Sequence, residues 1–327
     1  MSKPREVLVF GAGVIGAYLT HVLIQAGNHV TVLARKERAE SLNKHGLVIY
    51  HHLQRKTTRD SVTAITDAKD RSFDAVFVVM PYHKLKEALP QIYELNTKLL
   101  VLVGNDLSPA RIAEDIKRNA PGIRKIMFGF QVSGGKKEKD SYICERFGRS
   151  FMDIGKLHGR TSDKLRKWIE KMFAGTGYKL NWQDDMESYL ICHPAAILPI
   201  GYLSYICGGD LRKSTSAQRR MMFDASHEAY ECLKKKGIAV YPVGDDKFYG
   251  NGVHGTLMKF LYFIMAKSKI GDLIACEHCR NAVSEMEEID LFYEELLKGC
   301  PKDELTIWNR LRSQMPSWEK LHKKYGN

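Results

Sequence analysis

One stretch near the start of the chain constrains the fold most: Val7–Arg35 reads VLVFGAGVIGAYLTHVLIQAGNHVTVLAR. An apolar strand-like run leads into glycines, a helix-like segment follows, and a second strand-like run ends on an arginine. Gly11, Gly13 and Gly16 have the G-x-G-x-x-G spacing. The first glycine permits a tight turn, the second lets a pyrophosphate approach the backbone, and the third lets the helix pack closely against the strand. The pattern predicts a βαβ unit that binds a dinucleotide; the alternative is a glycine-rich turn without a ligand.

The end of the second strand discriminates between two dinucleotides. An acidic side chain there would accept a hydrogen bond from a free ribose 2′-hydroxyl and would repel a 2′-phosphate. This chain has Arg35 instead, followed by Lys36 and Arg38. A guanidinium can hold a phosphate with paired, charge-assisted hydrogen bonds. We therefore expect NADP(H) rather than NAD(H); the alternative is that these residues are ordinary surface cations.

Strand-like and helical segments alternate in the first half of the chain, which is typical of βαβ units on a parallel sheet. After Gly134 the alternation loosens, and from Met186 onward helical periodicity dominates. The predicted fold class is α/β, with a Rossmann-type doubly wound parallel sheet at residues 1–182 and an all-α domain at residues 183–327. The expected strands are Val7–Phe10, His29–Ala34, Ala75–Met80 and Leu99–Val103, and the expected helices include Lys164–Phe173, Ala217–Lys236, Leu257–Lys267, Val283–Lys298 and Asp303–Gln314.

Asn105 follows one of these strands directly, in the run LLVLVGNDLS. Ligands of an open α/β sheet collect at the carboxyl ends of its strands, so the amide of Asn105 could reach the nicotinamide or a substrate. An asparagine that merely forms a turn is the alternative. The complete set of residues expected to bind the cofactor is Gly11, Gly13, Val14, Ile15, Gly16, Arg35, Lys36 and Asn105.

The chain has a formal net charge of +12 over 327 residues, which is long enough for two domains. Its cations are scattered, as in KKEKD (136–140), DKLRKW (163–168) and LKKKG (233–237), rather than gathered in one arm. This distribution predicts a solvated basic surface that favours an anionic cofactor or substrate, and no nucleic-acid partner.

The seven cysteines have no regular spacing, and the polar segment Met1–Glu6 leads straight into a strand without a signal-peptide pattern. We therefore expect reduced thiols and a cytoplasmic protein. Cys276 and Cys279 form a C-x-x-C pair around His278, which could seed a zinc site or a redox pair. A structural zinc needs four ligands, and the sequence offers no second pair at a suitable distance. The prediction is a plain loop with no bound metal.

Tyr189–Gly209 has no formally charged residue and is long enough to span a bilayer. However, it contains His193, Pro194 and Pro199, and no other segment suggests a membrane. We expect a buried helix between the domains rather than a membrane span.

Taken together, these motifs resemble the 2-dehydropantoate 2-reductase (ketopantoate reductase) family over nearly the full length. The resemblance rests on Gly11–Arg35, on Asn105 in the place of the asparagine of the family's QNG, on Gly208–Pro242, and on Glu285–Phe292 (EMEEIDLF). It implies a dinucleotide-binding domain followed by a helical domain, and an activity in which NADPH reduces a 2-keto acid.

The resemblance also implies an active-site helix with a lysine and, four and eight residues later, two asparagines on the same face. In the family the lysine protonates the developing alkoxide, and the amides hold the substrate. The corresponding segment here, DDMESYLICHPAAILPI (184–200), has Ser188, Cys192 and Ala196 at these positions. An alignment shifted by one residue gives Tyr189, His193 and Ile197, so neither alignment contains the lysine.

Other family positions also differ. Asp106 replaces the glycine of QNG, and CEHCRNA (276–282) replaces a serine-bearing segment. Glu288, in EID, matches the family.

A ketone reduction needs a proton donor near the substrate oxygen, and general acids typically contribute about 10²–10⁴-fold. His193 is the first candidate because histidine titrates near neutral pH, and Tyr189 is the second. A histidine satisfied by a backbone carbonyl or buried beside Pro194 is the alternative for His193. Glu288 could orient the donor, and Ser188 occupies the place of the lysine.

These observations predict an NADPH-dependent oxidoreductase that reduces a small, 2-keto acid-like carbonyl compound. The alternative is a catalytically degenerate NADP(H)-binding sensor or regulatory protein. The expected partners are a small-molecule carbonyl substrate and a second copy of the chain in a homodimer, with no nucleic acid and no membrane.

Overall fold

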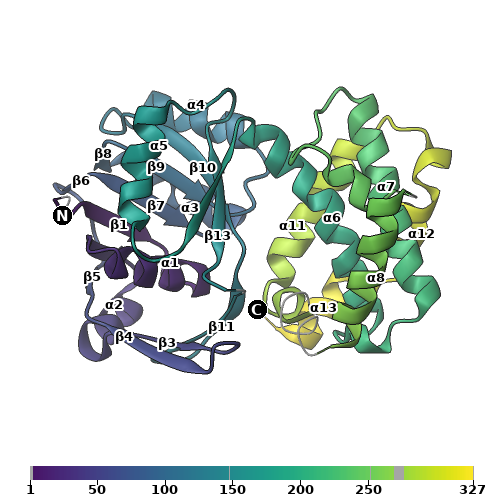
Figure 1. The fold of residues 1–327 in the computed structure, drawn as a ribbon, viewed down its shortest axis with the longest axis horizontal. Helices are drawn as coiled ribbons and strands as arrows, with labels where there is room; N and C mark the ends of the chain where they lie inside the picture. Colours follow the sequence, from purple (N-terminus) through teal and green to yellow (C-terminus); the bar gives the residue numbers. More distant parts are fainter. Residues whose placement is uncertain (1–2, 147, 251, 269–275, 327) are drawn as a thin grey trace. The chain divides into compact units, whose positions relative to one another are not determined.

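The computed structural model describes residues 3–146, 148–250, 252–268 and 276–326. The chain divides into two compact units, Met1–Glu187 and Ser188–Asn327 (Figure 1). The first unit is an α/β domain with a mainly parallel sheet, and the second is helical. The predicted fold class is therefore confirmed.

A doubly wound sheet of eight strands forms the centre of the N-terminal unit, in the order β14-β13-β10-β9-β7-β1-β2-β5. The six strands from β10 to β5 pair in parallel, whereas β13 runs antiparallel to β10. Following the chain, β2 and then β5 are added on one side of β1. The next strand of this sheet, β7, pairs with β1 on its other side. The topological switch point, where such folds bind ligands, therefore lies between β1 and β7. The strands are β1 (Glu6–Phe10), β2 (His29–Leu33), β5 (Thr63–Ile65), β7 (Ala75–Val79), β9 (Leu100–Val103), β10 (Ile126–Gln131), β13 (Phe151–Gly155) and β14 (Lys179–Gln183).

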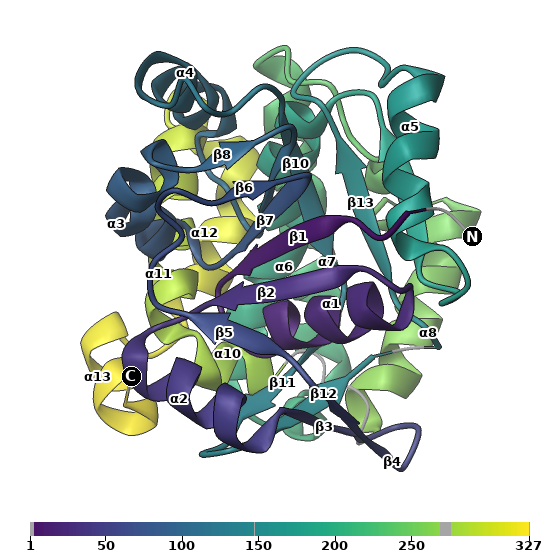
Figure 2. The same cartoon turned by 90° about the vertical axis from the view of Figure 1, so that its left-hand side faces the viewer.

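Helices cover both faces of this sheet. Every residue of β7 and β9 is buried, as expected of central parallel strands that are covered on both sides. In Figures 1 and 2, α1 and α5 lie over one face, and α3 and α4 lie over the other. The side chains of α1 and of the segment after α5 enter the same apolar core as the strands, with Phe77 and Phe173 in edge-to-face contact. The helices of this unit are α1 (Val14–Gln25), α2 (Lys36–His45), α3 (Tyr82–Tyr93), α4 (Pro109–Asn119) and α5 (Asp163–Glu170), followed by the 3-10 turn η1 (Lys171–Phe173).

A second sheet of four strands, in the order β11-β12-β3-β4, was not predicted from the sequence. It consists of two hairpins whose inner strands, β12 and β3, pair in parallel although they lie far apart in the chain. Its strands are grouped below α1 and β5 in Figure 2. A two-stranded sheet joins β6 (Ser72–Phe73) to β8 (Asn96–Thr97). The strands of the second sheet are β3 (Leu47–His51), β4 (Lys56–Asp60), β11 (Gly134–Lys137) and β12 (Tyr142–Glu145).

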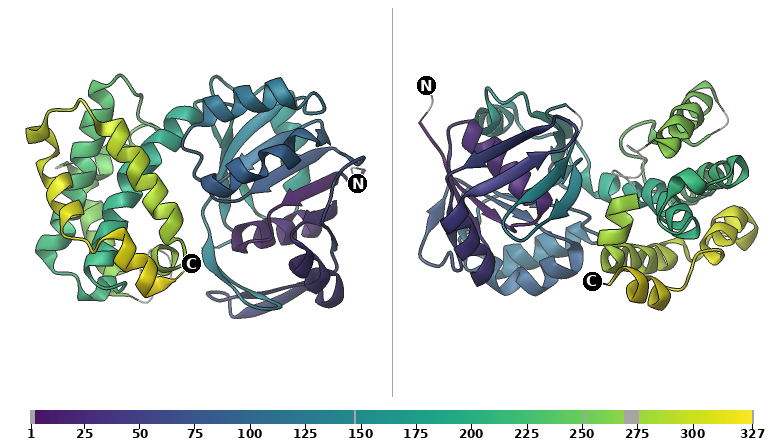
Figure 3. Two further views of the ribbon diagram at one scale, coloured as in Figure 1. Left: turned by 180° about the vertical axis from the view of Figure 1, so that it is seen from behind. Right: turned by 90° about the horizontal axis from the view of Figure 1, so that it is seen from below.

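The C-terminal unit is built around the long apolar helix α6 (Met186–Ile206), and its other helices can be followed in Figure 3. By length and composition α6 could cross a membrane, but 72% of its most apolar stretch is buried inside the protein. Pro194 and Pro199 lie inside this helix. The predicted buried helix is therefore present. The remaining elements are η2 (Leu211–Lys213), α7 (Ser216–Lys235), η3 (Asp245–Phe248), α8 (Val253–Lys267), α10 (Glu277–Asn281), α11 (Val283–Leu297), η5 (Lys302–Leu305), α12 (Thr306–Ser313) and α13 (Trp318–Tyr325).

Asp290, which is 1% exposed, connects four helices of this unit. Its carboxylate accepts hydrogen bonds from Tyr202 on α6 and Trp318 on α13. It also forms a bidentate pair with Arg312 on α12, at 2.8 Å for both nitrogen–oxygen distances. A buried carboxylate is tolerated only when it is paired and hydrogen-bonded, and Asp290 meets both conditions.

The expectation that all thiols are reduced is wrong for two cysteines. Cys232 at the end of α7 and Cys300 after α11 are joined by a disulfide, although 68 positions separate them in sequence. The helical packing brings the two residues together, and their spacing in the chain gave no sign of it. Five other cysteines are buried and form no disulfide within the described residues: Cys144, Cys192, Cys207, Cys276 and Cys279.

Candidate cofactor-binding and active site

The glycine loop between β1 and α1 has the geometry that a bound pyrophosphate requires. Gly11 has φ +121°, and a Cβ on it would lie 2.2 Å from the carbonyl oxygen of Val79 in β7. A Cβ on Gly16 would lie 2.0 Å from the carbonyl oxygen of Gly11. These two glycines are therefore required by packing within the protein. A Cβ on Gly13, in contrast, would meet no protein atom within 4 Å. Space at Gly13 is what a ligand approaching the backbone needs.

The start of α1 offers hydrogen-bond donors to such a ligand. Gly13 is the N-cap residue, and no side chain caps the helix. The first intrahelical bond runs from the Ala17 amide to the Gly13 carbonyl, at 2.8 Å. The amides of Val14, Ile15 and Gly16 therefore have no carbonyl partner within the helix. With no acidic residue in this first turn, the helix dipole favours an anion at this position.

Cations gather where β2 ends. Arg35 is the N-cap residue of α2, and Arg35 and Lys36 are both exposed. Lys137, at the end of β11, lies close enough to Arg35 and Arg38 for their charges to affect its pKa. Burial is the largest cause that lowers the pKa of Lys137, followed by the positive charges of Arg38 and Arg35. The charges of Arg38 and Arg35 therefore reach Lys137, and an anion placed among the three would be attracted to all of them.

Sequence reasoning missed Lys137, because KKEKD reads as a charged surface loop. The four-stranded sheet carries this loop to α2. Arg38 donates a hydrogen bond to the Glu138 carbonyl at 2.9 Å, and Ser41 donates one to Asp140 at 2.9 Å. These contacts span about a hundred residues of sequence, so no local pattern could have revealed them.

Asn105 and Asp106 follow the carboxyl end of β9, on the edge of the sheet that carries the glycine loop. Both are buried, at 9% and 4% exposure. Asp106 accepts a hydrogen bond from the Ser108 amide through one carboxylate oxygen, at 3.1 Å. Its other oxygen is buried without a hydrogen-bond partner among the described residues. Burial raises the pKa of Asp106 to about 7, against opposing effects of the Ser108 bond and the Lys86 charge.

The pKa makes Asp106 a candidate functional residue that the sequence did not reveal. A carboxyl group with a pKa near 7 is protonated in about half of the molecules at neutral pH, so it can donate a hydrogen bond or a proton. In the sequence, Asp106 appeared only as a departure from the family's glycine.

The catalytic residues predicted on α6 belong to the C-terminal unit. Tyr189 is buried, and its ring stacks on that of His193 with a centroid distance of 6.2 Å. Ser188 is half-buried in the first turn of the helix. Burial and, to a smaller extent, the charge of His278 lower the pKa of His193 to about 4. His193 is therefore neutral at physiological pH, which weakens the prediction that its imidazolium donates the proton.

Glu288 lies on α11, which is joined to α6 by a hydrogen bond from the Tyr293 hydroxyl to the Ile191 carbonyl, at 2.7 Å. The structure thus brings the helix of Glu288 to the helix of His193. It also shows that Asp290, two residues further along EID, is the acid that holds the helices together.

The prediction of a loop at the CEHC segment is wrong, because Glu277, His278 and Cys279 begin helix α10. The segment packs into the C-terminal unit. The Leu211 amide donates a hydrogen bond to the Cys276 sulfur at 3.4 Å, and Cys279 is 4% exposed. Burial raises the pKa of Cys279 to about 12. A thiol with such a pKa is a poor metal ligand and a poor nucleophile at neutral pH. Among the described residues, no group of three or more His, Cys, Asp or Glu side chains could hold a metal ion.

Comparisons with known proteins agree with this arrangement. Residues 7–159 match the sequence model of the family described as ketopantoate reductase PanE/ApbA. An uncharacterized oxidoreductase, YkpB of Bacillus subtilis, is 34% identical over 87 residues, which is 27% of this chain and 28% of that protein. The 2-dehydropantoate 2-reductase of Pyrococcus horikoshii is 23% identical over 212 residues, or 63% of this chain and 66% of that protein. The matched segments thus span less than two thirds of each relative.

Among solved structures, the ternary complex of D-mandelate dehydrogenase with NADH and anilino(oxo)acetate has the same fold, with a TM-score of 0.69. Sequence identity to it is 13%, and the likeness covers 98% of this chain and all of that one, at 100%. The segment that matches the ketopantoate reductase PanE/ApbA model, residues 7–159, carries the glycine loop and Asn105.

Proposed function

We propose that this protein is an NADP(H)-dependent oxidoreductase that interconverts a small, 2-keto acid-like carbonyl compound and its alcohol. The glycine loop is the observation that carries the proposal. Gly11 and Gly16 are held tightly against protein backbone, while Gly13 is left open to a ligand at the start of α1. This arrangement fits the pyrophosphate of a nicotinamide dinucleotide. When bound, the reduced nicotinamide ring of that cofactor would supply the hydride.

The choice of NADP(H) rests on the cations Arg35, Lys36, Arg38 and Lys137. An adenosine 2′-phosphate placed among them would reduce their mutual repulsion and would accept charge-assisted hydrogen bonds. The position after β2 where an acid would bind a free 2′-hydroxyl carries Arg35 instead. The D-mandelate dehydrogenase complex contains NADH, which has no 2′-phosphate.

The substrate class rests on the family and on the neighbours. The Pyrococcus relative is named for the reduction of 2-dehydropantoate, and the ligand of the D-mandelate dehydrogenase complex is an oxoacetate. Ketopantoate itself is not the substrate that we propose, because Ser188, Cys192 and Ala196 stand where the family has a lysine and two asparagines.

The proton must come from the chain or from water, and three side chains are candidates for the donor. His193 is neutral at neutral pH and can only donate as a neutral imidazole, which is a weak acid. Tyr189 remains a candidate, as in the sequence analysis. Asp106 is a third, because its carboxyl group keeps a proton up to a pH of about 7.

The missing lysine and the low pKa of His193 favour a second candidate function, an NADP(H)-binding sensor or regulatory protein that has lost catalysis. Both functions require the same cofactor site, and they differ only in turnover.

Titration of the purified protein with NADPH and with NADH, followed by nicotinamide fluorescence, tests the cofactor assignment. We expect tighter binding of NADPH, and we expect Arg35→Ala and Lys137→Ala to remove that preference while NADH affinity changes little. Arg310→Ala is the control, because Arg310 is an exposed arginine of the helical unit and the substitution makes the same change in net charge. A preference for NADH in the unmodified protein would overturn the assignment of Arg35.

A panel of 2-keto acids with NADPH, monitored by loss of the reduced nicotinamide absorbance, separates the two functions. Turnover of any member supports the enzyme, and variants His193→Ala, Tyr189→Phe and Asp106→Asn then locate the donor through their pH–rate profiles. Tight NADPH binding without turnover of any member would favour the sensor.

A further inference from the structure

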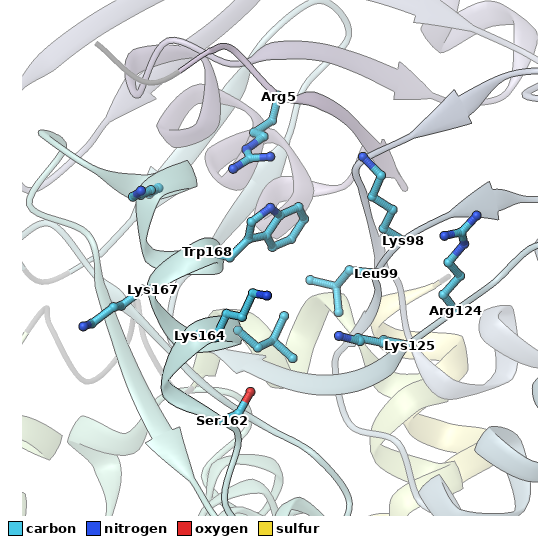
Figure 4. Close-up of a pocket in the computed structure, with 11 residues that line it drawn as sticks. Arg5, Lys98, Leu99, Arg124, Lys125, Ser162, Lys164, Lys167 and Trp168 are labelled. Atoms are coloured by element: carbon cyan, nitrogen blue, oxygen red, sulfur yellow. The ribbon is translucent and has the colours of Figure 1, made fainter.

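A basic cavity lies at the edge of the large sheet that is opposite the glycine loop. It has a volume of about 660 Å³ and is shown in Figure 4. Its walls come from residues just before the amino ends of β1, β9 and β10 and from helix α5. The lining residues are Arg5, Lys98, Leu99, Arg124, Lys125, Ser162, Lys164, Leu165, Lys167, Trp168 and Lys171. Seven of these are cations and none is acidic.

The cations converge for a topological reason. Parallel strands share an amino edge, so residues that precede β1, β9 and β10 in sequence become neighbours although they are far apart in the chain. On α5 and the turn after it, Lys164, Lys167 and Lys171 recur at intervals of three and four residues, which places them on one side of the helix. Leu165 and Trp168 pack against the apolar core. In Figure 4, Lys164 and Lys125 extend toward Leu99 and Trp168.

Most of these charges lack a counterion. Lys98 pairs with Asp74 at 2.6 Å. The other six cations form no ion pair with any residue in the described part of the chain. The guanidinium of Arg5 lies 4.8 Å from the centre of the Trp168 ring, and its Nε is buried without a hydrogen-bond partner among the described residues. Arg5 interacts at longer range with Asp74, whose pKa it helps to lower. The cations around the cavity repel one another, and a multivalent anion would relieve that repulsion.

From this convergence we infer that the cavity is a second anion site, separate from the cofactor site, that binds the polyphosphate group of a small ligand. The volume lies in the range of small-molecule sites. A polyphosphate offers several charged oxygens at close spacing, which matches lysines and arginines arriving from several segments. Leu165 and Trp168, which are partly exposed, provide apolar surface that an organic part of the ligand, such as a nucleoside, can contact.

The geometry favours a small ligand over a nucleic acid. Single-stranded nucleic acids need a positively charged groove that continues along the backbone, with aromatic side chains at intervals. Here the cations surround one cavity, and Trp168 is the aromatic residue in its lining.

Calorimetric titration of the full-length protein with inorganic tripolyphosphate and, separately, with ATP tests this inference. Both titrations are carried out at low ionic strength with NADPH at saturation, so that the glycine loop is not available to ATP. We expect both probes to bind, and we expect the double variant Lys125→Gln/Lys164→Gln to weaken both by about tenfold or more. The matched control is Lys320→Gln/Lys323→Gln, which makes the same change in net charge with two exposed lysines of α13. Circular dichroism and the Tm of each variant verify that it is folded.

The two probes identify the source of the polyphosphate. Tighter binding of ATP indicates a nucleotide ligand, and equal affinities indicate recognition of the polyphosphate alone; both support the site. Equal weakening by the cavity variant and the control variant would overturn it, because the attraction would then be a property of the whole surface. The inferred small-ligand site would also be overturned if single-stranded RNA bound much more tightly than tripolyphosphate, with an affinity that increased with RNA length. A failure of NADPH to bind would contradict the proposed cofactor function and would leave the tripolyphosphate comparison intact.

Discussion

The substitution Gly13→Ser separates the role of the glycine loop in binding from its role in folding. Gly13 is the N-cap residue of α1, with φ −81° and ψ −176°, a conformation open to any residue. A Cβ there would meet no protein atom within 4 Å. Serine is a better N-cap than glycine by a few tenths of a kcal/mol, since its hydroxyl accepts a hydrogen bond from the first turn. Without cofactor, the variant should therefore be as stable as the unmodified protein or slightly more stable.

With cofactor present, the same change should be harmful. The added Cβ and hydroxyl would occupy the space through which a pyrophosphate reaches the amides at the start of α1. Each hydrogen bond to a charged group contributes about 1.5–3 kcal/mol. The loss of one or two such bonds, about 3 kcal/mol in all, weakens cofactor binding by roughly a hundredfold.

Gly252→Ser is the matched control. Gly252 is the N-cap residue of α8, with φ −79° and ψ −177°, and a Cβ on it would also meet nothing within 4 Å. Both variants should change the free energy of unfolding, measured in urea, by the same few tenths of a kcal/mol. Only Gly13→Ser should lose affinity in the fluorescence titration. If Gly13→Ser binds NADPH within a factor of about three of the unmodified protein, the open space at Gly13 does not serve a cofactor.

Three further outcomes follow from the structure. The raised pKa of Asp106 means that the native state holds its proton up to a pH of about 7, so its ionisation lowers stability between pH 4 and 7. Asp106→Asn should gain stability over the unmodified protein by up to about 4 kcal/mol at pH 8 and by little at pH 4; an equal gain in urea unfolding at both pH values would contradict this. Asp290→Asn should lower the free energy of unfolding by about 3 kcal/mol, since it leaves Arg312 without its charged partner, and an unchanged urea midpoint would refute the role of that pair. Cys232→Ser should lower the free energy of unfolding by up to about 4 kcal/mol under non-reducing conditions, the amount expected for a closed loop of this length, and the Tm should fall accordingly. A reductant should remove the difference in Tm between the variant and the unmodified protein.

The sequence alone determined the dinucleotide-binding loop and the order of the first strands. The spacing of Gly11, Gly13 and Gly16 could be read directly, because the constraints on φ and on Cβ space arise within a few residues. The helical character of the second half was likewise visible, since its apolar residues recur with the period of a helix.

The second sheet and the disulfide were not visible. The strands β3 and β12 pair although about ninety residues separate them, and Cys232 meets Cys300 only through the packing of α7 with the end of α11. Local propensity is a weak guide where partners are distant in sequence, because strand pairing and burial depend on neighbours that the chain order does not reveal.

The chemistry of single side chains was decided at the tertiary level as well. The sequence offers His193 as an acid, yet its surroundings lower its pKa to about 4; it treats Asp106 as a mismatch, yet burial raises that pKa to about 7. Lys137 comes close to Arg35 only when the sheets form, and the same holds for the cations that line the basic cavity. The amino-acid sequence fixes which charges exist, whereas the distances between them and their access to water, which set their energies, arise only when the chain has folded.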